Sequence, residues 1–203
     1  MIEEIGVAAG LCEREVMMMR SIVLVMAYGM MSLATSSTAL PTQYLPVWGG
    51  GGGNAFTRSC GTGRVLTGLQ YRVGLLVDAV GVLCRPVQDD GKLGSETTVG
   101  SFAGGGNGAA NSQSCPSGQV VSGALIIFGS FTDGIHLRCH AWSAGGRTFG
   151  STTQKNLYIG ADGVRPGGTS KGESCEASTQ PAVGIRGRAS AVVDAIGFFC
   201  DEP

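Results

Sequence analysis

Residues 74–84 read GLLVDAVGVLC, and two later segments repeat the same plan: GSFTDGIHLRC at 129–139 and SAVVDAIGFFC at 190–200. Each segment is an apolar run with one aspartate near its start and one cysteine at its end. Apolar and β-branched runs joined by a short turn are typical of β-hairpins. Because a single hairpin is only marginally stable in water, we expect the three hairpins to share one hydrophobic core.

The cysteines place these segments in a regular repeat. Apart from Cys12, six cysteines form pairs separated by 24, 24 and 25 positions, and a glycine stands ten residues before each of the three aspartates: Gly68, Gly123 and Gly184. A fixed period of this kind indicates a repeat architecture. Six cysteines allow several connectivities. Repeat symmetry favours pairing within each unit: Cys60–Cys84, Cys115–Cys139 and Cys175–Cys200.

The first 39 residues differ from the rest of the chain. Arg20 precedes an apolar run at 21–34, and the small residues Ser37 and Ala39 follow it. This order is typical of a secretory signal peptide. The apolar run is also shorter than the roughly 20 residues that a membrane-spanning helix needs.

The domain organisation follows from this pattern. We predict that residues 1–16 are an upstream extension absent from the mature protein, that 17–39 are the signal peptide and that 40–203 form a single domain. Its repeats are expected at about 47–90, 98–144 and 158–203. The mature protein is expected to be secreted, with disulfides and with no membrane span.

The composition limits both the fold class and the function. The chain has 203 residues, 35 glycines, 14% charged residues and a net charge of −1. Many glycines and few charges favour all-β structure with tight turns. A nearly neutral chain gives no reason to expect a nucleic-acid partner. Since the sequence has no recognisable catalytic motif and only two histidines, we expect no enzyme activity, no cofactor and no metal site.

Glycine-rich stretches stand ahead of all three units: WGGGGGN at 48–54, GGGNG at 104–108 and PGG at 166–168. Together with the G-x-x-x-D turns, they resemble the jacalin-related lectins. WGGGGGNAF is similar to the opening loop of that family, and VVDAIGFF at 192–199 is similar to its closing strand. The resemblance implies a β-prism I fold with three Greek-key-like repeats, pseudo-threefold symmetry and one disulfide per repeat. Three similar sites in one chain most resemble the griffithsin-type arrangement.

The resemblance also implies a role for the aspartates. In such lectins the turn aspartate accepts hydrogen bonds from sugar hydroxyls, and backbone amides of the turn and of the glycine loop donate to the sugar. An ionised carboxylate is a strong acceptor, and glycine lets a backbone approach a ligand closely. The residues implied to contact carbohydrate are Asp78, Gly74 and Leu76; Asp133, Gly129 and Phe131; Asp194; and the loop residues Gly51, Gly52, Gly105, Gly106 and Gly168.

The three turns are not identical. Phe131 gives the second turn an aromatic side chain, whereas Ser190 replaces glycine in the third. We therefore expect the Asp133 site to bind best, the Asp78 site next and the Asp194 site least.

Two interpretations of the aspartates stay open. In the first, the protein is a lectin whose partners are glycans or glycoproteins. In the second, it is a structural protein of an extracellular coat, like the vitelline membrane outer layer protein, which also has three repeats in a β-prism. The aspartates would then only cap their own turns. The sequence defines neither the sugar nor whether the chain forms homo-oligomers.

Overall fold

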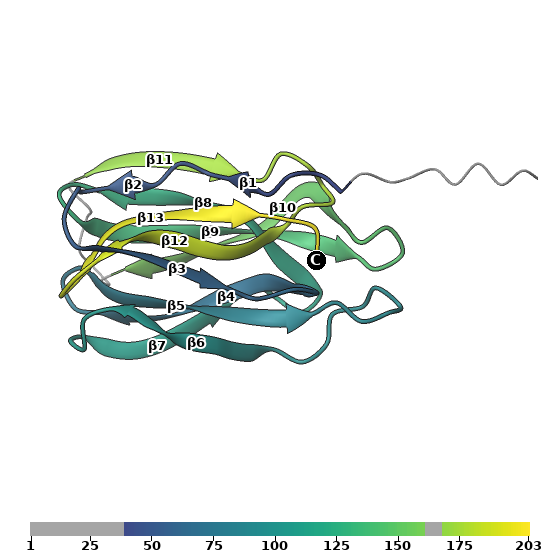
Figure 1. The fold of residues 1–203 in the computed structure, drawn as a ribbon, viewed down its shortest axis with the longest axis horizontal. Coiled ribbons are helices and arrows are strands. Elements are labelled where there is room, and N and C mark those ends of the chain that lie inside the picture. Colours follow the sequence, from purple (N-terminus) through teal and green to yellow (C-terminus); the bar gives the residue numbers. More distant parts are fainter. Residues whose placement is uncertain (1–38, 161–167) are drawn as a thin grey trace, which may run out of the picture. The chain divides into compact units, whose positions relative to one another are not determined.

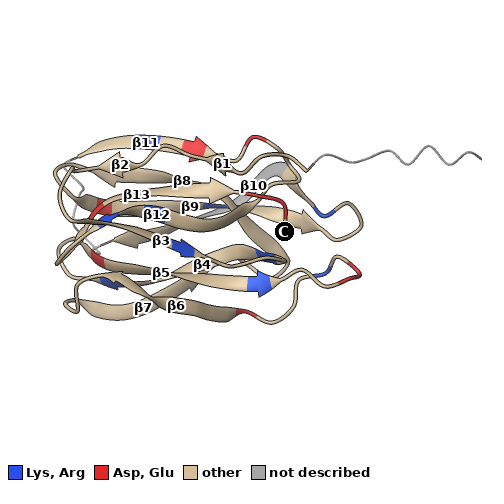
Figure 2. Cartoon of the chain, viewed as in Figure 1, with Lys and Arg blue, Asp and Glu red and all other residues tan. Residues whose placement is uncertain are grey.

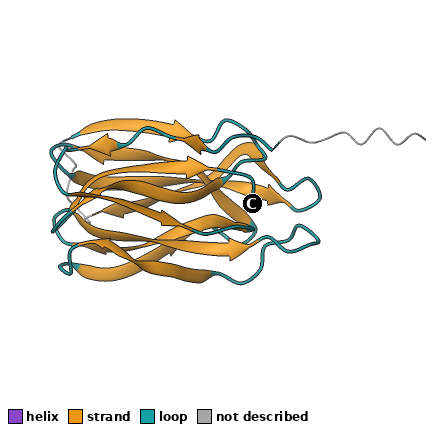
Figure 3. Ribbon diagram, viewed as in Figure 1, coloured by secondary structure: helices purple, strands orange, loops and turns teal. Residues whose placement is uncertain are grey.

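A computed structural model of the chain describes residues 39–160 and 168–203, which belong to one compact unit, Ala39–Pro203. The described residues form thirteen β-strands and no helix, as Figure 3 shows. They accordingly contain no helix that could cross a membrane. The expectation of an all-β fold is confirmed.

The strands form three antiparallel sheets, each with one of the three predicted hairpins at its centre (Figure 1). The first sheet has the order β6-β5-β4-β7, and the second has the order β10-β9-β8-β11. In both, four successive strands are arranged as a Greek key. The strands of the first sheet are β4 (Arg64–Val73), β5 (Val77–Pro86), β6 (Thr97–Gly104) and β7 (Ala109–Ser114). Those of the second are β8 (Gln119–Phe128), β9 (Thr132–Ser143), β10 (Thr148–Gly160) and β11 (Thr169–Ser174).

The third sheet combines the two ends of the domain. Its central hairpin comes from the carboxyl end of the chain, and the flanking strands come from the amino end, in the order β1-β13-β12-β3, with β2 also paired to β13. The strands are β1 (Gln43–Tyr44), β2 (Trp48–Gly49), β3 (Asn54–Ser59), β12 (Ala182–Ala189) and β13 (Val193–Cys200). The ring of three sheets is therefore closed by segments far apart in the sequence.

A β-bulge recurs in the first strand of every hairpin. The register shifts just before Gly68, Gly123 and Gly184. A Cβ at any of the three would collide with a backbone carbonyl oxygen of the flanking strand. Glycine at this position therefore permits a close approach between strands, which accounts for its fixed spacing from the aspartate.

The disulfides pair as expected, and they connect neighbouring sheets. The bonds are Cys60–Cys84, Cys115–Cys139 and Cys175–Cys200. In each, the first cysteine follows the last strand of one sheet, and the second lies in the central hairpin of the next sheet. Thus Cys60 follows β3 of the third sheet and bonds to Cys84 on β5 of the first. The three bonds close a ring of covalent links around the domain.

One hydrophobic cluster lies between the three sheets. Its fully buried members include Leu66 and Leu69 from the first sheet, Ile135 and Leu137 from the second, and Ile185 and Ile196 from the third. Because every sheet contributes a face to this shared core, no repeat can bury its apolar residues alone. The structure confirms the expected β-prism I architecture.

Candidate functional site

The tips of the three hairpins have the same backbone geometry. The N–H of the first turn residue donates to the C=O two residues later, from Gly74 to Leu76 at 3.1 Å, from Gly129 to Phe131 at 3.0 Å and from Ser190 to Val192 at 2.9 Å. The aspartate then occupies the second position of the following strand. Serine at position 190 thus preserves this backbone hydrogen bond, and its Oγ lies 3.5 Å from Oδ2 of Asp194.

The glycine stretches do not pack against the hairpins that follow them in the sequence. The first stretch packs against the third hairpin, where the Gly50 N–H donates to the carbonyl oxygen of Asp194 at 2.8 Å. The second packs against the first hairpin, where the Gly105 N–H donates to the carbonyl oxygen of Asp78 at 2.9 Å. Gly168 lies against Asp133 of the second hairpin, since a Cβ there would come within 2.8 Å of Oδ2. Pro166 and Gly167 of the third stretch lie outside the described residues.

This pairing differs from the order in the sequence, in which each glycine stretch precedes its unit. The physical reason is the Greek key. The loop between the two outer strands of a sheet returns to the tip of that sheet's central hairpin, which precedes it in the chain. For the third sheet the outer strands come from the amino end, so the first stretch, 48–54, meets the last hairpin.

The glycine loops lie directly over the carboxylates. Gly53 and Gly108 have φ values of +63° and +74°, and a Cβ on either would collide with Oδ2 of the aspartate below. By contrast, a Cβ at Gly51 or Gly106 would meet no atom within 4 Å. The first two glycines are therefore required by the loop geometry, whereas the other two form its open tip.

Sequence reasoning selected Gly51, Gly52, Gly105 and Gly106 but missed the glycines at both ends of each loop. Gly49 and Gly104 also have positive φ, at +138° and +121°, and lie against the aspartate carbonyl. The signal that could have found them is the shared G-x-x-x-G spacing of 49/53 and 104/108.

At the Asp194 and Asp78 sites an arginine side chain holds the glycine loop. Arg188 donates from Nε to the Gly52 carbonyl at 2.7 Å and from Nη2 to the Gly53 carbonyl at 2.6 Å. Arg72 donates from Nη1 to the carbonyls of Gly106 and Gly108, both at 3.2 Å. We call these two side chains the loop arginines.

The loop arginines occupy equivalent positions, each four residues after the bulge glycine of its hairpin. The equivalent residue of the second hairpin is Ile127, which has no donor. Sequence reasoning missed Arg72 and Arg188, although their fixed distance from Gly68 and Gly184 could have revealed them.

The aspartates differ in their surroundings. Asp78 is 7% exposed and Asp194 is 3% exposed. Oδ2 of Asp78 is buried and has no hydrogen-bond partner among the described residues. Asp133 is partly exposed, and burial raises the pKa of its carboxyl above the ordinary value. A buried acceptor without a partner is rare in folded proteins and requires an explanation.

Two apolar side chains are exposed at the hairpin tips. Leu75 of the first hairpin is 81% exposed, and Phe131 of the second is 39% exposed. Leu76, which the resemblance selected, is partly buried instead. The tips therefore combine carboxylates with exposed apolar surface, a combination that suits ligands with both hydroxyl groups and apolar faces.

The three candidate sites are neighbours at one end of the domain. A Cβ at Gly50 would collide with the backbone oxygen of Ser130, and a Cβ at Gly105 would collide with that of Ala191. The loop of the Asp194 site therefore touches the turn of the Asp133 site, and the loop of the Asp78 site touches the turn of the Asp194 site. Figure 1 shows the hairpin tips at the left end of the strands.

Figure 2 shows positively and negatively charged residues scattered over the strands and loops of the described part of the chain. Within the described part of the chain, no group of three His, Cys, Asp or Glu side chains is close enough to hold a metal ion.

Comparison with solved structures identifies the fold as that of the jacalin-related lectins. The artocarpin–mannotriose complex matches with a TM-score of 0.56 at 15% identity, over 80% of this chain and 99% of the other. The Calystegia sepium lectin in complex with a biantennary N-glycan matches with a TM-score of 0.54 at 17% identity, over 82% and 100%. A mannose-binding jacalin-related lectin from Ananas comosus matches with a TM-score of 0.52 at 18% identity, over 80% and 99%. No family model and no curated protein sequence matches the chain.

Proposed function

We propose that the protein is a secreted carbohydrate-binding protein that binds glycans, without catalysis, between its glycine loops and aspartate turns. The observation that supports this most is the buried Oδ2 of Asp78, which lacks a hydrogen-bond partner beneath the second loop. Leaving a buried acceptor unpaired costs about 1–3 kcal/mol. A sugar hydroxyl can supply the missing hydrogen bond when the loop that covers this oxygen moves aside.

The surroundings of the carboxylates also fit a sugar. Gly51 and Gly106 leave open space at the loop tips. Leu75 and Phe131 offer apolar contacts to the C–H face of a pyranose ring. Because the solved lectins of this fold include complexes with mannotriose and with an N-glycan, mannose-containing glycans are the first ligands to test.

Secretion is part of the proposal. It is supported by the predicted signal peptide at 17–39 and by three disulfides, which persist in oxidising compartments.

The adjacency of the sites has a consequence for affinity. Three neighbouring sites on one face can engage several branches of one glycan at once, and the effective concentration of the second branch strengthens the whole contact. Each site alone is therefore expected to bind weakly, and branched glycans are expected to bind far more tightly than monosaccharides.

The test is a glycan array probed with the full chain and with variants in which the aspartates are changed to asparagine. Asparagine preserves the shape but removes the negative charge and replaces one acceptor by a donor. Asp78→Asn combined with Asp194→Asn should reduce the array signal by at least about tenfold while the thermal midpoint changes little. An array signal equal to that of the wild type in the folded double variant would show that these turns do not bind glycans.

A structural role in an extracellular coat is the second candidate. The low exposure of Asp78 and Asp194 favours it, because carboxylates that are covered by glycine loops can also serve to hold the loops in place. In that case the aspartate variants would lower stability, and the wild-type protein would give no array signal.

A further inference from the structure

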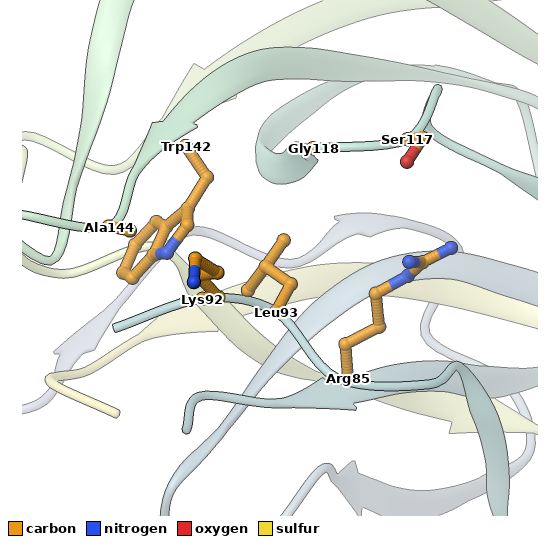
Figure 4. Close-up of a pocket in the computed structure, with 7 residues that line it drawn as sticks. All are labelled: Arg85, Lys92, Leu93, Ser117, Gly118, Trp142 and Ala144. Carbon is orange, nitrogen blue, oxygen red and sulfur yellow. The ribbon is translucent and has the colours of Figure 1, made fainter. Parts of the chain in front are cut away.

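A cavity of about 250 Å³ lies at the opposite end of the strands from the aspartate turns. It is lined by the last part of β5, the loop that follows it, the turn before β8 and the end of β9 (Figure 4). The residues are Arg85, Lys92, Leu93, Ser117, Gly118, Trp142 and Ala144. The cavity lies between the first and second sheets, and none of its lining residues comes from the third sheet.

The walls of the cavity are held by hydrogen bonds. The Trp142 indole Nε1 donates to the Gly91 carbonyl at 2.8 Å, and the Trp142 backbone N–H donates to the Gly118 carbonyl at 2.9 Å. The loop itself is closed by a hydrogen bond from the Gln88 N–H to the Lys92 carbonyl at 2.9 Å. Because the indole N–H is already paired, Trp142 contributes chiefly an apolar surface.

The lining contains two cations and no carboxylate. Arg85 lies with Nε 3.7 Å from Oε2 of Glu96, but Glu96 is not part of the lining and also accepts hydrogen bonds from Thr67 and Ser114, both at 2.6 Å. Among the described residues, the terminal nitrogens of Arg85 have no hydrogen-bond partner. Lys92 pairs with Asp90 at 2.8 Å outside the lining, and its side chain is 72% exposed.

The two sides of the cavity differ in chemistry. Figure 4 shows Trp142 at one side with Lys92 beside it, Leu93 in the middle, and Arg85 and the Ser117 hydroxyl at the other side. A guanidinium with free terminal nitrogens matches a carboxylate through two parallel hydrogen bonds. The volume is below the roughly 300–1,000 Å³ that is usual for drug-sized ligands, so it fits a single ring.

We propose that this cavity binds a single sugar acid, with its carboxylate on Arg85, its ring against Leu93 and Trp142, and a hydroxyl on Ser117. Lys92 adds a second positive charge at the mouth. This site is separate from the aspartate turns, and it would give the protein two ends with different ligand classes, neutral glycans at one end and acidic sugars at the other.

The test uses glucuronate as the probe and glucose as its neutral counterpart. Both are titrated into the full chain while the indole N–H resonances are followed by NMR, and Trp142→Phe assigns the resonance of Trp142. Glucuronate should shift this resonance saturably, with an affinity at least about tenfold higher than that of glucose. Arg85→Gln should weaken glucuronate binding by about tenfold, because it removes a charge-assisted pair of hydrogen bonds.

Lys92→Gln is the second variant, since an exposed loop side chain can be changed without disturbing the fold. It should weaken glucuronate binding about threefold. Equal shifts from glucose and glucuronate, or wild-type affinity in both folded variants, would overturn the proposal. The double variant with Asp78→Asn and Asp194→Asn is the control at the other end, and it should leave glucuronate binding unchanged. Reduced neutral-glycan binding together with unchanged glucuronate binding would separate the two sites.

Discussion

The Asp78 and Asp194 sites differ from the Asp133 site in the residue at the loop-arginine position and in the exposure of the carboxylate. At the first two, a loop arginine fastens two loop carbonyls and the carboxylate is almost fully buried. At the third, Ile127 stands in the arginine position and Asp133 is partly exposed beside Phe131. The repeats therefore differ in what each offers a ligand. The first and third hairpins offer a loop held in place by an arginine, whereas the second offers the aromatic side chain of Phe131.

These differences predict two opposite rankings of the three sites by their affinity for a glycan. The aromatic side chain of Phe131 favours the Asp133 site, as the sequence led us to expect. The loop arginines favour the Asp78 and Asp194 sites, because a loop that is already ordered loses less conformational entropy on binding. Variants that act on one feature at a time decide between these orders, and each site can be followed by NMR during titration with mannotriose.

The largest effect is expected when the covering glycines are changed. Gly53→Ala and Gly108→Ala place a Cβ against an aspartate carboxylate at positive φ, so the loop must move. Binding at the Asp194 and Asp78 sites should then disappear, and each change should cost about 1–3 kcal/mol of stability. The readouts are mannotriose titration and thermal unfolding.

The matched controls for these variants are Gly51→Ala and Gly106→Ala, where a Cβ would meet open space. They should leave stability unchanged within about 0.5 kcal/mol. If the control pair and the covering pair destabilise the protein equally, the collision of a Cβ with the carboxylate does not account for the loss of stability.

A smaller effect is expected from the loop arginines. Arg72→Ile and Arg188→Ile reproduce the residue of the second hairpin and should weaken binding at the Asp78 and Asp194 sites about tenfold, or roughly 1.4 kcal/mol. Binding at the Asp133 site should not change. Isothermal titration with mannotriose, supported by site-resolved NMR, measures both.

Lysine variants at the same positions separate geometry from charge. Arg72→Lys and Arg188→Lys preserve the positive charge but lose the planar fork that spans two carbonyls. Full recovery of affinity by lysine would mean that the arginines act through charge and do not position the loop.

A modest pH effect is expected at the Asp133 site. Burial raises the pKa of this carboxyl, so it becomes protonated at a pH above the ordinary range for aspartate as the solution is acidified. Since the ionised form is the stronger acceptor for sugar hydroxyls, affinity at this site should fall as the pH drops through that raised value.

The raised pKa of Asp133 also makes the stability of the fold depend on pH. Burial penalises the charged form, so the ionised Asp133 destabilises the fold above its raised pKa, and this penalty is relieved as the pH falls through that value. Asp133→Asn should remove the pH dependence of the site, measured by mannotriose titration between pH 4 and pH 7. A pH profile in the variant identical to that of the wild type would contradict the assignment.

The smallest effect is expected at position 190. The Ser190 turn has the same backbone hydrogen bond as the two glycine turns, so Ser190→Gly should change affinity at the Asp194 site by less than about twofold. An increase of tenfold on mannotriose titration would show that the serine side chain obstructs the ligand.

Much of the fold could be predicted because its signals are periodic. The three hairpins and the disulfide pairs follow from residue types at fixed spacing, as with Cys60–Cys84. The spacing also singled out Gly68 and its two equivalents, but the β-bulge beside each appears only in the structure. The resemblance of the glycine loops and aspartate turns then predicted the β-prism, which the structure confirms.

The arrangement of the site could not be predicted in the same way. The partner of Asp194 is the loop at 48–54, more than a hundred residues away, because strands from both ends of the domain share one sheet. The order in the sequence, in which each glycine stretch precedes a unit, does not reveal this pairing. The loop arginines were missed because their hydrogen-bond acceptors are loop carbonyls far away in the sequence, as with Arg188 and Gly52. Only the folded structure shows that these groups are neighbours.

The most direct test of the central claim is a mannotriose titration of the isotopically labelled full chain, in which the backbone amides of Gly50, Gly105 and Gly129 are followed by NMR. Their N–H groups lie at the three aspartate turns, whereas Gly118 lies at the opposite end and serves as the internal reference. The account predicts saturable shifts at the turns, with Gly118 unmoved. Unshifted turn resonances at saturating mannotriose, or shifts confined to the end that contains Gly118, would contradict it.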